Sequence, residues 1–106
     1  MLGQLFEHLV AQSVLVYAQA AGAHVRHLRQ RDGRQEIDLI VERGRSVVAI
    51  EVKLATTVRP DDVKHLLWLQ ARLGDSLADA VVVTTEQQAY RRPDGVAVVP
   101  AALLGL

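Results

Sequence analysis

Residues 36 to 53 read Glu-Ile-Asp-Leu-Ile-Val-Glu-Arg-Gly-Arg-Ser-Val-Val-Ala-Ile-Glu-Val-Lys, and this stretch decides the fold. Side chains alternate with a period of two in both halves, which is typical of β-strands. A two-residue turn at Arg43-Gly44 would join the halves into a hairpin. We therefore expect two antiparallel strands that share one continuously apolar face, on which Ile37 and Leu39 lie together.

The other face of this hairpin carries three charged residues, Asp38, Glu51 and Lys53. The expected turn places Asp38 opposite Ala49 and diagonal to Glu51, with Cβ atoms about 7–8 Å apart. Two carboxylates at that separation can share a divalent cation, and Mg²⁺ is commonly held by one or two carboxylates together with water and phosphate oxygens. Lys53 lies on the same face as Glu51, where an ammonium group can hold a water molecule or stabilise charge on a phosphate.

A simpler interpretation of the same residues is an ion pair between Glu51 and Lys53 on an exposed sheet face, which contributes little to stability. The presence of a lysine at this position favours a functional role, because arginine is the usual basic residue of this chain. Ten of the twelve basic residues are arginine, and the two lysines are Lys53 and Lys64. From the hairpin alone, both interpretations stay open.

The rest of the chain supplies helices and further strands around the hairpin. Helical spacing predicts a helix over residues 4–21 with Gly22 as its C-terminal cap, and Glu7 falls in its first turn. A second helix begins at Pro60 and ends before Gly74. The remaining predicted elements are strands at 24–30, 80–84 and 95–99 and a turn at 31–34. The predicted order is αβββαβ with one more strand after it, in an α/β fold with a central mixed sheet flanked by helices.

The order of the charged residues resembles a known nuclease superfamily. Glu7 on the first helix, Asp38 on one strand and Glu51-Val52-Lys53 on the next look like the PD-(D/E)XK, or restriction-endonuclease-like, pattern. More narrowly, the chain resembles an uncharacterised C-terminal domain of bacterial and archaeal AAA+-type ATPases in Gly3, Phe6, Glu7 and Val10, in Glu36-Ile37-Asp38 and in Ile50-Glu51-Val52-Lys53. Ile37 stands where the superfamily pattern has a proline.

This resemblance implies a restriction-endonuclease-like core and a Mg²⁺- or Mn²⁺-dependent hydrolase of DNA. It implies that Asp38, Glu51 and Glu7 hold the metal and that Lys53 acts with them in catalysis. It also implies that residues 1–106 form one domain of a longer ATPase-type chain, with the ATPase module as a partner in cis or in trans.

Composition limits the remaining possibilities. Twelve acidic and twelve basic residues give a formal net charge of zero, so any contact with DNA must be local. The chain has no cysteine and no uninterrupted apolar stretch of about 18 residues, and we expect a cytoplasmic protein without a membrane partner.

A different class of function also fits the sequence. The first helix is more apolar than one buried face requires, as Leu5, Val14 and Leu15 indicate, and the tail 96–106 is apolar as well. Self-association is therefore expected. The alternative to a nuclease is a non-catalytic module for dimerisation or protein interaction that is attached to an AAA+-type ATPase.

Overall fold

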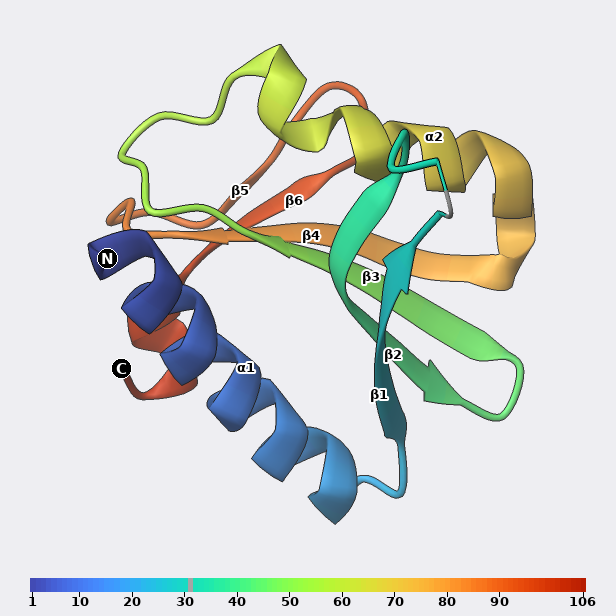
Figure 1. Cartoon of the computed structure of the whole chain (residues 1–106), viewed down its shortest axis with the longest axis horizontal. Coiled ribbons are helices and arrows are strands. Elements are labelled where there is room, and N and C mark those ends of the chain that lie inside the picture. Colours follow the sequence, from blue (N-terminus) through green and yellow to red (C-terminus); the bar gives the residue numbers. More distant parts are fainter. Residues whose placement is uncertain (31) are drawn as a thin grey trace.

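A six-stranded mixed sheet with one α-helix on each face forms the molecule (Figure 1). The computed structural model describes residues 1–30 and 32–106, so Arg31 of the expected turn lies outside the described residues. The elements are α1 (Leu2–Ala20), β1 (His24–Arg29), β2 (Glu36–Arg43), β3 (Ser46–Val52), the 3-10 turn η1 (Pro60–Val63), α2 (Lys64–Leu73), η2 (Gly74–Ser76), β4 (Leu77–Thr84), β5 (Tyr90–Arg91), β6 (Ala97–Pro100) and η3 (Ala101–Leu104). The predicted α/β class with a mixed sheet between helices is confirmed.

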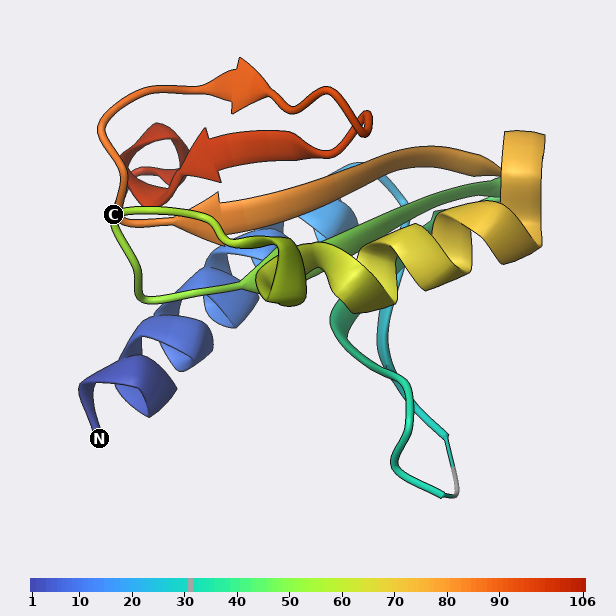
Figure 2. The same cartoon turned by 90° about the horizontal axis from the view of Figure 1, so that it is seen from above.

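The sheet has the strand order β1-β2-β3-β4-β6-β5. Strands β1, β2 and β3 pair antiparallel, β4 lies parallel to β3 and to β6, and β5 returns antiparallel to β6. The helix α2 connects β3 to β4 as a crossover, which a parallel pair requires. Figure 2 shows α2 along one side of the sheet and the β1–β2 hairpin extending away from the body.

Helix α1 covers one face of the sheet with a stripe of side chains four residues apart. Val10, Val14 and Ala18 are buried, and this i, i+4, i+8 spacing places them on one side of the helix. The helix ends where Gly22 adopts a φ of +71° and its N–H bonds the carbonyl of Gln19 at 3.2 Å. The predicted C-terminal cap at Gly22 is therefore confirmed.

Two apolar cores form, one on each face of the sheet. On one face, Leu66 and Leu69 of α2 pack with Ile37, Ile40 and other sheet residues. On the opposite face, Val10 and Val14 of α1 pack against a second set of strand residues, which are Leu39, Ile50, Val52 and Val83. Every strand of the central hairpin is thus held from both sides.

The hairpin register differs from the predicted one. Arg43 pairs with Ser46, so the turn is Gly44-Arg45 and Gly44 takes the positive φ of +60° at its first position. As a result Ile40, and not Asp38, lies opposite Ala49. The β2–β3 ladder ends one residue before Asp38, at the pair Leu39 and Ile50.

The predicted continuous face of β2 is also wrong, because the strand contains a β-bulge. From Arg26↔Ile40 to Leu28↔Ile37, two steps along β1 correspond to three along β2. The extra residue changes the alternation. Ile37 consequently packs with Ile40 on the α2 side, while Leu39 packs on the α1 side.

The C-terminal part adds elements that the sequence did not predict. Strand β4 begins at Leu77, three residues before the predicted start, and β5 and η3 were not predicted. The apolar tail is mostly part of the core, since Val96 and Val98 are fully buried and Leu103 and Leu106 are the large apolar residues of this segment that stay exposed. Among the described residues, no helix is long and apolar enough to cross a membrane.

The core on the α2 side predicts a clear difference between two leucines. Leu66 is completely buried, whereas Leu54 is 48% exposed. Leu66→Ala should lower the free energy of unfolding by about 2–5 kcal/mol, because it removes buried methyl groups and leaves a cavity. Leu54→Ala should change it by less than about 0.5 kcal/mol. Urea denaturation measures both values, and equal losses would contradict the assignment of the core.

Candidate functional site

Asp38 and Glu51 meet where the backbone ladder between β2 and β3 has ended. The backbone N–H of Asp38 donates to Oε1 of Glu51 at 3.3 Å, and the N–H of Val52 donates to Oδ2 of Asp38 at 2.8 Å. Each side chain thus binds the backbone of the neighbouring strand. The shifted register brings the two carboxylates beside each other, closer than the expected diagonal arrangement.

Glu51 lies in an environment that opposes its negative charge. Glu51 is only 5% exposed and is the one buried charged residue among those the structure describes. The pKa of Glu51 is raised to about 8, because burial and then the charge of Asp38 raise it by more than the hydrogen bond from the Asp38 backbone and the charge of Lys53 lower it. A surface ion pair on an exposed sheet face is therefore the wrong interpretation of Glu51.

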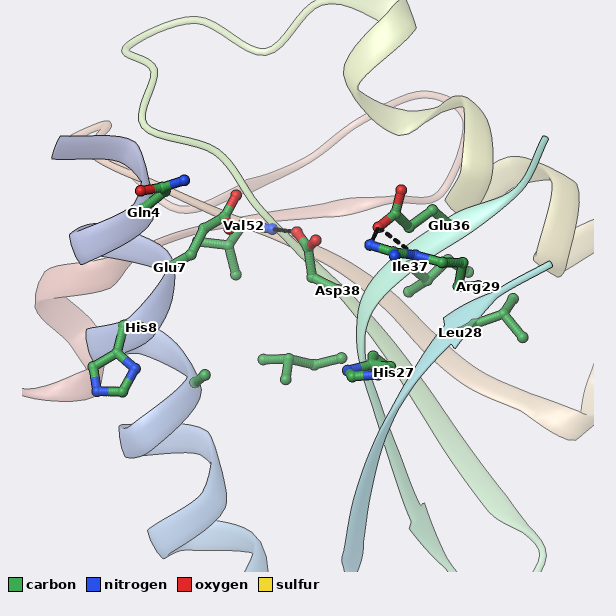
Figure 3. A pocket seen from close by; sticks show the side chains of 12 residues that line it. Gln4, Glu7, His8, His27, Leu28, Arg29, Glu36, Ile37, Asp38 and Val52 are labelled. Atoms are coloured by element: carbon green, nitrogen blue, oxygen red, sulfur yellow. Dashed lines mark hydrogen bonds and ion pairs between the residues drawn. The ribbon is translucent and has the colours of Figure 1, made fainter. Parts of the chain in front are cut away.

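Glu7 approaches the same place from helix α1. Glu7 and Asp38 line one pocket of about 370 Å³ together with Val52, and their side chains face each other across it (Figure 3). Partial burial raises the pKa of the Glu7 carboxyl, the charge of Asp38 raises it further and that of Lys53 lowers it. Glu7 thus shares the pocket with Asp38 and lies within electrostatic reach of Lys53.

Lys53 follows β3 and supplies the positive charge of the group. Its backbone N–H bonds the carbonyl of Val83 on β4 at 2.9 Å, which fixes its position beside the parallel strand. The ammonium group acts electrostatically on both Glu7 and Glu51. None of the ion pairs within the described part of the chain involves Lys53. The structure thus brings all four predicted site residues into one region, in which Glu7 and Asp38 line the pocket and Glu51 and Lys53 do not.

Comparison with known proteins places the chain in a family. Residues 2–104 match DUF4143, a domain of unknown function. The chain belongs to this family. DUF4143 domains are often found at the C-terminus of AAA-type ATPases, in agreement with the narrower resemblance seen in the sequence. A search of the curated proteins found no match.

The pocket of this DUF4143 domain has further polar walls that the sequence did not indicate. Gln4 and His8 lie on α1 beside Glu7, and His27 of β1 lines the hairpin side (Figure 3). The spacing of Gln4, Glu7 and His8 along a helix could have placed them on one face. His27 gave no such signal, because its position depends on the packing of α1 against the β1–β2 hairpin.

An ion pair closes the pocket on the hairpin side. Nη2 of Arg29 lies 2.8 Å from Oε1 of Glu36, and this bond lowers the pKa of the Glu36 carboxyl. Arg29 is therefore already paired. Glu7 and Asp38 are the acidic side chains at the pocket that form no ion pair among the described residues.

Carboxylate oxygens are the ligands that Mg²⁺ prefers, and the pair Asp38 and Glu51 matches the usual number of protein carboxylates in a magnesium site. The described residues contain no group of three or more His, Cys, Asp or Glu side chains close enough to enclose a metal ion. The donor set fits a site completed by water and substrate oxygens. It does not fit a site built from protein ligands alone.

The pKa of Glu51 predicts an unusual dependence of stability on pH. Its folded-state value, about 8, lies above its ordinary value of 4.5, so the folded state keeps a proton that the unfolded state loses. The contribution of Glu51 to the free energy of unfolding is fully present below about pH 4.5 and is lost as the pH rises toward 8. Glu51→Gln keeps the acceptor for the Asp38 N–H but cannot ionise.

In chelator-treated protein, Glu51→Gln should therefore gain stability relative to wild type across that window. By pH 8 the gain should exceed about 1.4 kcal/mol, the equivalent of one pKa unit. Urea denaturation at several pH values between 5 and 8 measures it. Glu42→Gln, on the same sheet but at the surface, is the matched control and should leave the pH profile unchanged. Parallel profiles for Glu51→Gln and wild type would contradict the buried-carboxylate account.

Proposed function

We propose that this domain is a metal-dependent nuclease that hydrolyses phosphodiester bonds in DNA, with a restriction-endonuclease-like core of the PD-(D/E)XK type. One observation carries the proposal. Two carboxylates from neighbouring strands, Asp38 and Glu51, are held together in a place that is partly removed from water. Such a pair is unfavourable by itself and becomes favourable when a cation binds.

The positions of the four residues along the fold support the same proposal. Glu7 comes from the first helix, Asp38 from the second strand, and Glu51 with Lys53 from the third. This is the order in which the resembling superfamily carries its site. The elements α1, β1, β2, β3, α2 and β4 also follow one another in the order αβββαβ.

In the proposed site Asp38 and Glu51 hold Mg²⁺ or Mn²⁺, and Glu7 binds the ion or one of its waters. A bound divalent cation of this kind polarises a phosphoryl oxygen and lowers the pKa of a bound water. Three carboxylates face one ammonium group, so the residues present fit a divalent cation by charge as well as by ligand type.

The protein residues then have distinct tasks. Lys53, whose ammonium group is free of the ion pairs formed elsewhere, stabilises the negative charge that grows on the phosphate or orients the attacking water. Glu7 faces Asp38 from α1 and sets one wall of the substrate pocket. Because the formal net charge is zero, DNA is held by local contacts at this pocket.

A second candidate function is a non-catalytic module that dimerises or docks onto an AAA+-type ATPase, in cis or in trans. The observation that favours it is the apolar surface of α1, where Leu2, Leu5 and Val16 are more than half exposed. Under this alternative, the charged group is a structural or relic feature and binds no metal.

A cleavage assay tests the nuclease proposal. The domain is incubated with circular and linear, single- and double-stranded DNA in the presence of Mg²⁺ or Mn²⁺. Asp38→Asn, Glu51→Gln and Lys53→Ala should each lower the cleavage rate by at least about 100-fold, because they remove charge that acts on the reacting phosphate. Chelation of the metal should abolish cleavage.

Matched controls separate this effect from a general loss of charge. Asp61→Asn removes an exposed carboxylate that pairs with Lys64, and Glu42→Gln removes a partly exposed carboxylate that pairs with Arg26. Both variants should keep the wild-type rate. Cleavage that survives Asp38→Asn, or no cleavage of any of these substrates by folded wild-type protein, would contradict the proposal.

A further inference from the structure

Helix α1 has a second apolar side that nothing in the described structure covers. Opposite the buried stripe, four aliphatic side chains stay exposed: Leu2 at 72%, Leu5 at 54%, Leu9 at 44% and Val16 at 61%. Figures 1 and 2 show α1 on the outside of the molecule, with the sheet on one side of it only. Contiguous exposed apolar surface of this kind marks an interaction site.

The spacing of this surface identifies the shape of its partner. The exposed residues lie alternately three and four apart, at Leu2, Leu5, Leu9, Gln12, Val16 and Gln19, and we call this row the outer seam. An alternating three-four spacing is the seam of a coiled coil, in which a second helix inserts its side chains between those of the first. A strand or a flat surface would not match that period.

We propose that the outer seam binds the outer seam of a second copy of this chain, so that the domain forms a two-fold symmetric dimer through α1. Charges beside such a seam normally select or reject partners. Here the flanking positions are Met1, Phe6, His8, Ser13, Leu15 and Ala20, of which His8 alone has a titratable side chain. No pair of like-charged Asp, Glu, Lys or Arg side chains at these positions opposes association of two identical helices, and the zero net charge removes long-range repulsion.

The two glutamines of the outer seam favour identical partners in parallel orientation. In a parallel pair Gln12 meets Gln12 and Gln19 meets Gln19, and each amide can donate and accept a hydrogen bond. In an antiparallel pair centred on the seam, Gln12 would instead lie against Leu9 and Gln19 against Leu2. A polar residue at a seam position is known to set register and orientation in this way.

The size of the outer seam determines the expected affinity of the dimer. Six side chains per copy form a surface well below the roughly 800 Å² per partner of a standard interface. We therefore expect a dissociation constant in the range of about 1 to 100 µM. Glu7, Asp38, Glu51 and Lys53 lie outside the outer seam, so the existence of the dimer does not depend on the proposed nuclease activity, although His8 flanks both the seam and the pocket.

Sedimentation of the 106-residue chain at increasing concentration tests the proposal. The wild type should shift from monomer to dimer. Leu9→Glu places a carboxylate at the centre of the seam in both copies and should weaken association on the order of 100-fold or more. Leu54→Glu is the matched control, because the exposed fraction of Leu54, 48%, is similar to the 44% of Leu9, and Leu54 lies outside α1. It should leave association unchanged.

Circular dichroism and a thermal melt confirm that each variant is folded, and Leu5→Glu serves as a second seam variant. A wild type that stays monomeric to several hundred micromolar overturns the proposal and leaves a different protein as the partner of the seam. A dimer that is unaffected by both Leu9→Glu and Leu5→Glu also overturns it.

The absence of cysteine from the chain allows a direct test of orientation. Gln19→Cys should form a disulfide-linked dimer readily on mild oxidation, because the two new thiols meet in the parallel pair. In the antiparallel pair they would lie at opposite ends of the seam. A dimer by sedimentation that fails to cross-link through Gln19→Cys would overturn the parallel arrangement.

Discussion

The repulsion between two neighbouring carboxylates is the constraint on which the site depends. Asp38 and Glu51 are held side by side by backbone hydrogen bonds that each makes to the other strand, and Glu51 is almost fully buried. Water cannot screen their charges as it does at the surface. The pair must therefore be relieved by a proton, by the ammonium group of Lys53 or by a cation, and burial together with the charge of Asp38 raises the pKa of Glu51 to about 8.

The geometry behind this contact comes from two small irregularities of the central hairpin. The turn at Gly44-Arg45 sets the register that places Asp38 beside Glu51, and the bulge in β2 turns the strand so that Asp38 lines the pocket with Glu7. Bulges commonly redirect a side chain next to an active site. The cores on both faces of the sheet hold the hairpin in this shape, so the stability of the fold and the arrangement of the charges are linked.

Much of this could be predicted from the sequence, and the failures have physical reasons. The period of two in residues 36–53 identified both strands. Because Glu51 and Lys53 are two residues apart, the same period placed them on one face, near Asp38. The register failed because either side of Gly44 can form a turn. The bulge, which separates Ile37 from Leu39, leaves no trace in the alternation of residue types. Glu7 was connected to the site only through the family resemblance, since a helix can pack on a sheet in several ways. The exposed face of α1 was predicted only in part, since Leu5 and Leu15 are exposed whereas Val14, which was counted with them, is buried in the core.

The binding of Mn²⁺ tests the central claim most directly, because it isolates the two carboxylates from any particular substrate. Thermal melts are recorded for wild type and Asp38→Asn with and without the ion. At about ten times its dissociation constant Mn²⁺ should stabilise the wild type by about 1.4 kcal/mol, or several degrees. Without metal, Asp38→Asn should be as stable as wild type or more so, since it relieves repulsion and keeps an oxygen for the Val52 N–H, and it should lose the response to Mn²⁺. No metal-dependent shift in the wild type, together with a steep loss of stability in Asp38→Asn, would contradict the account.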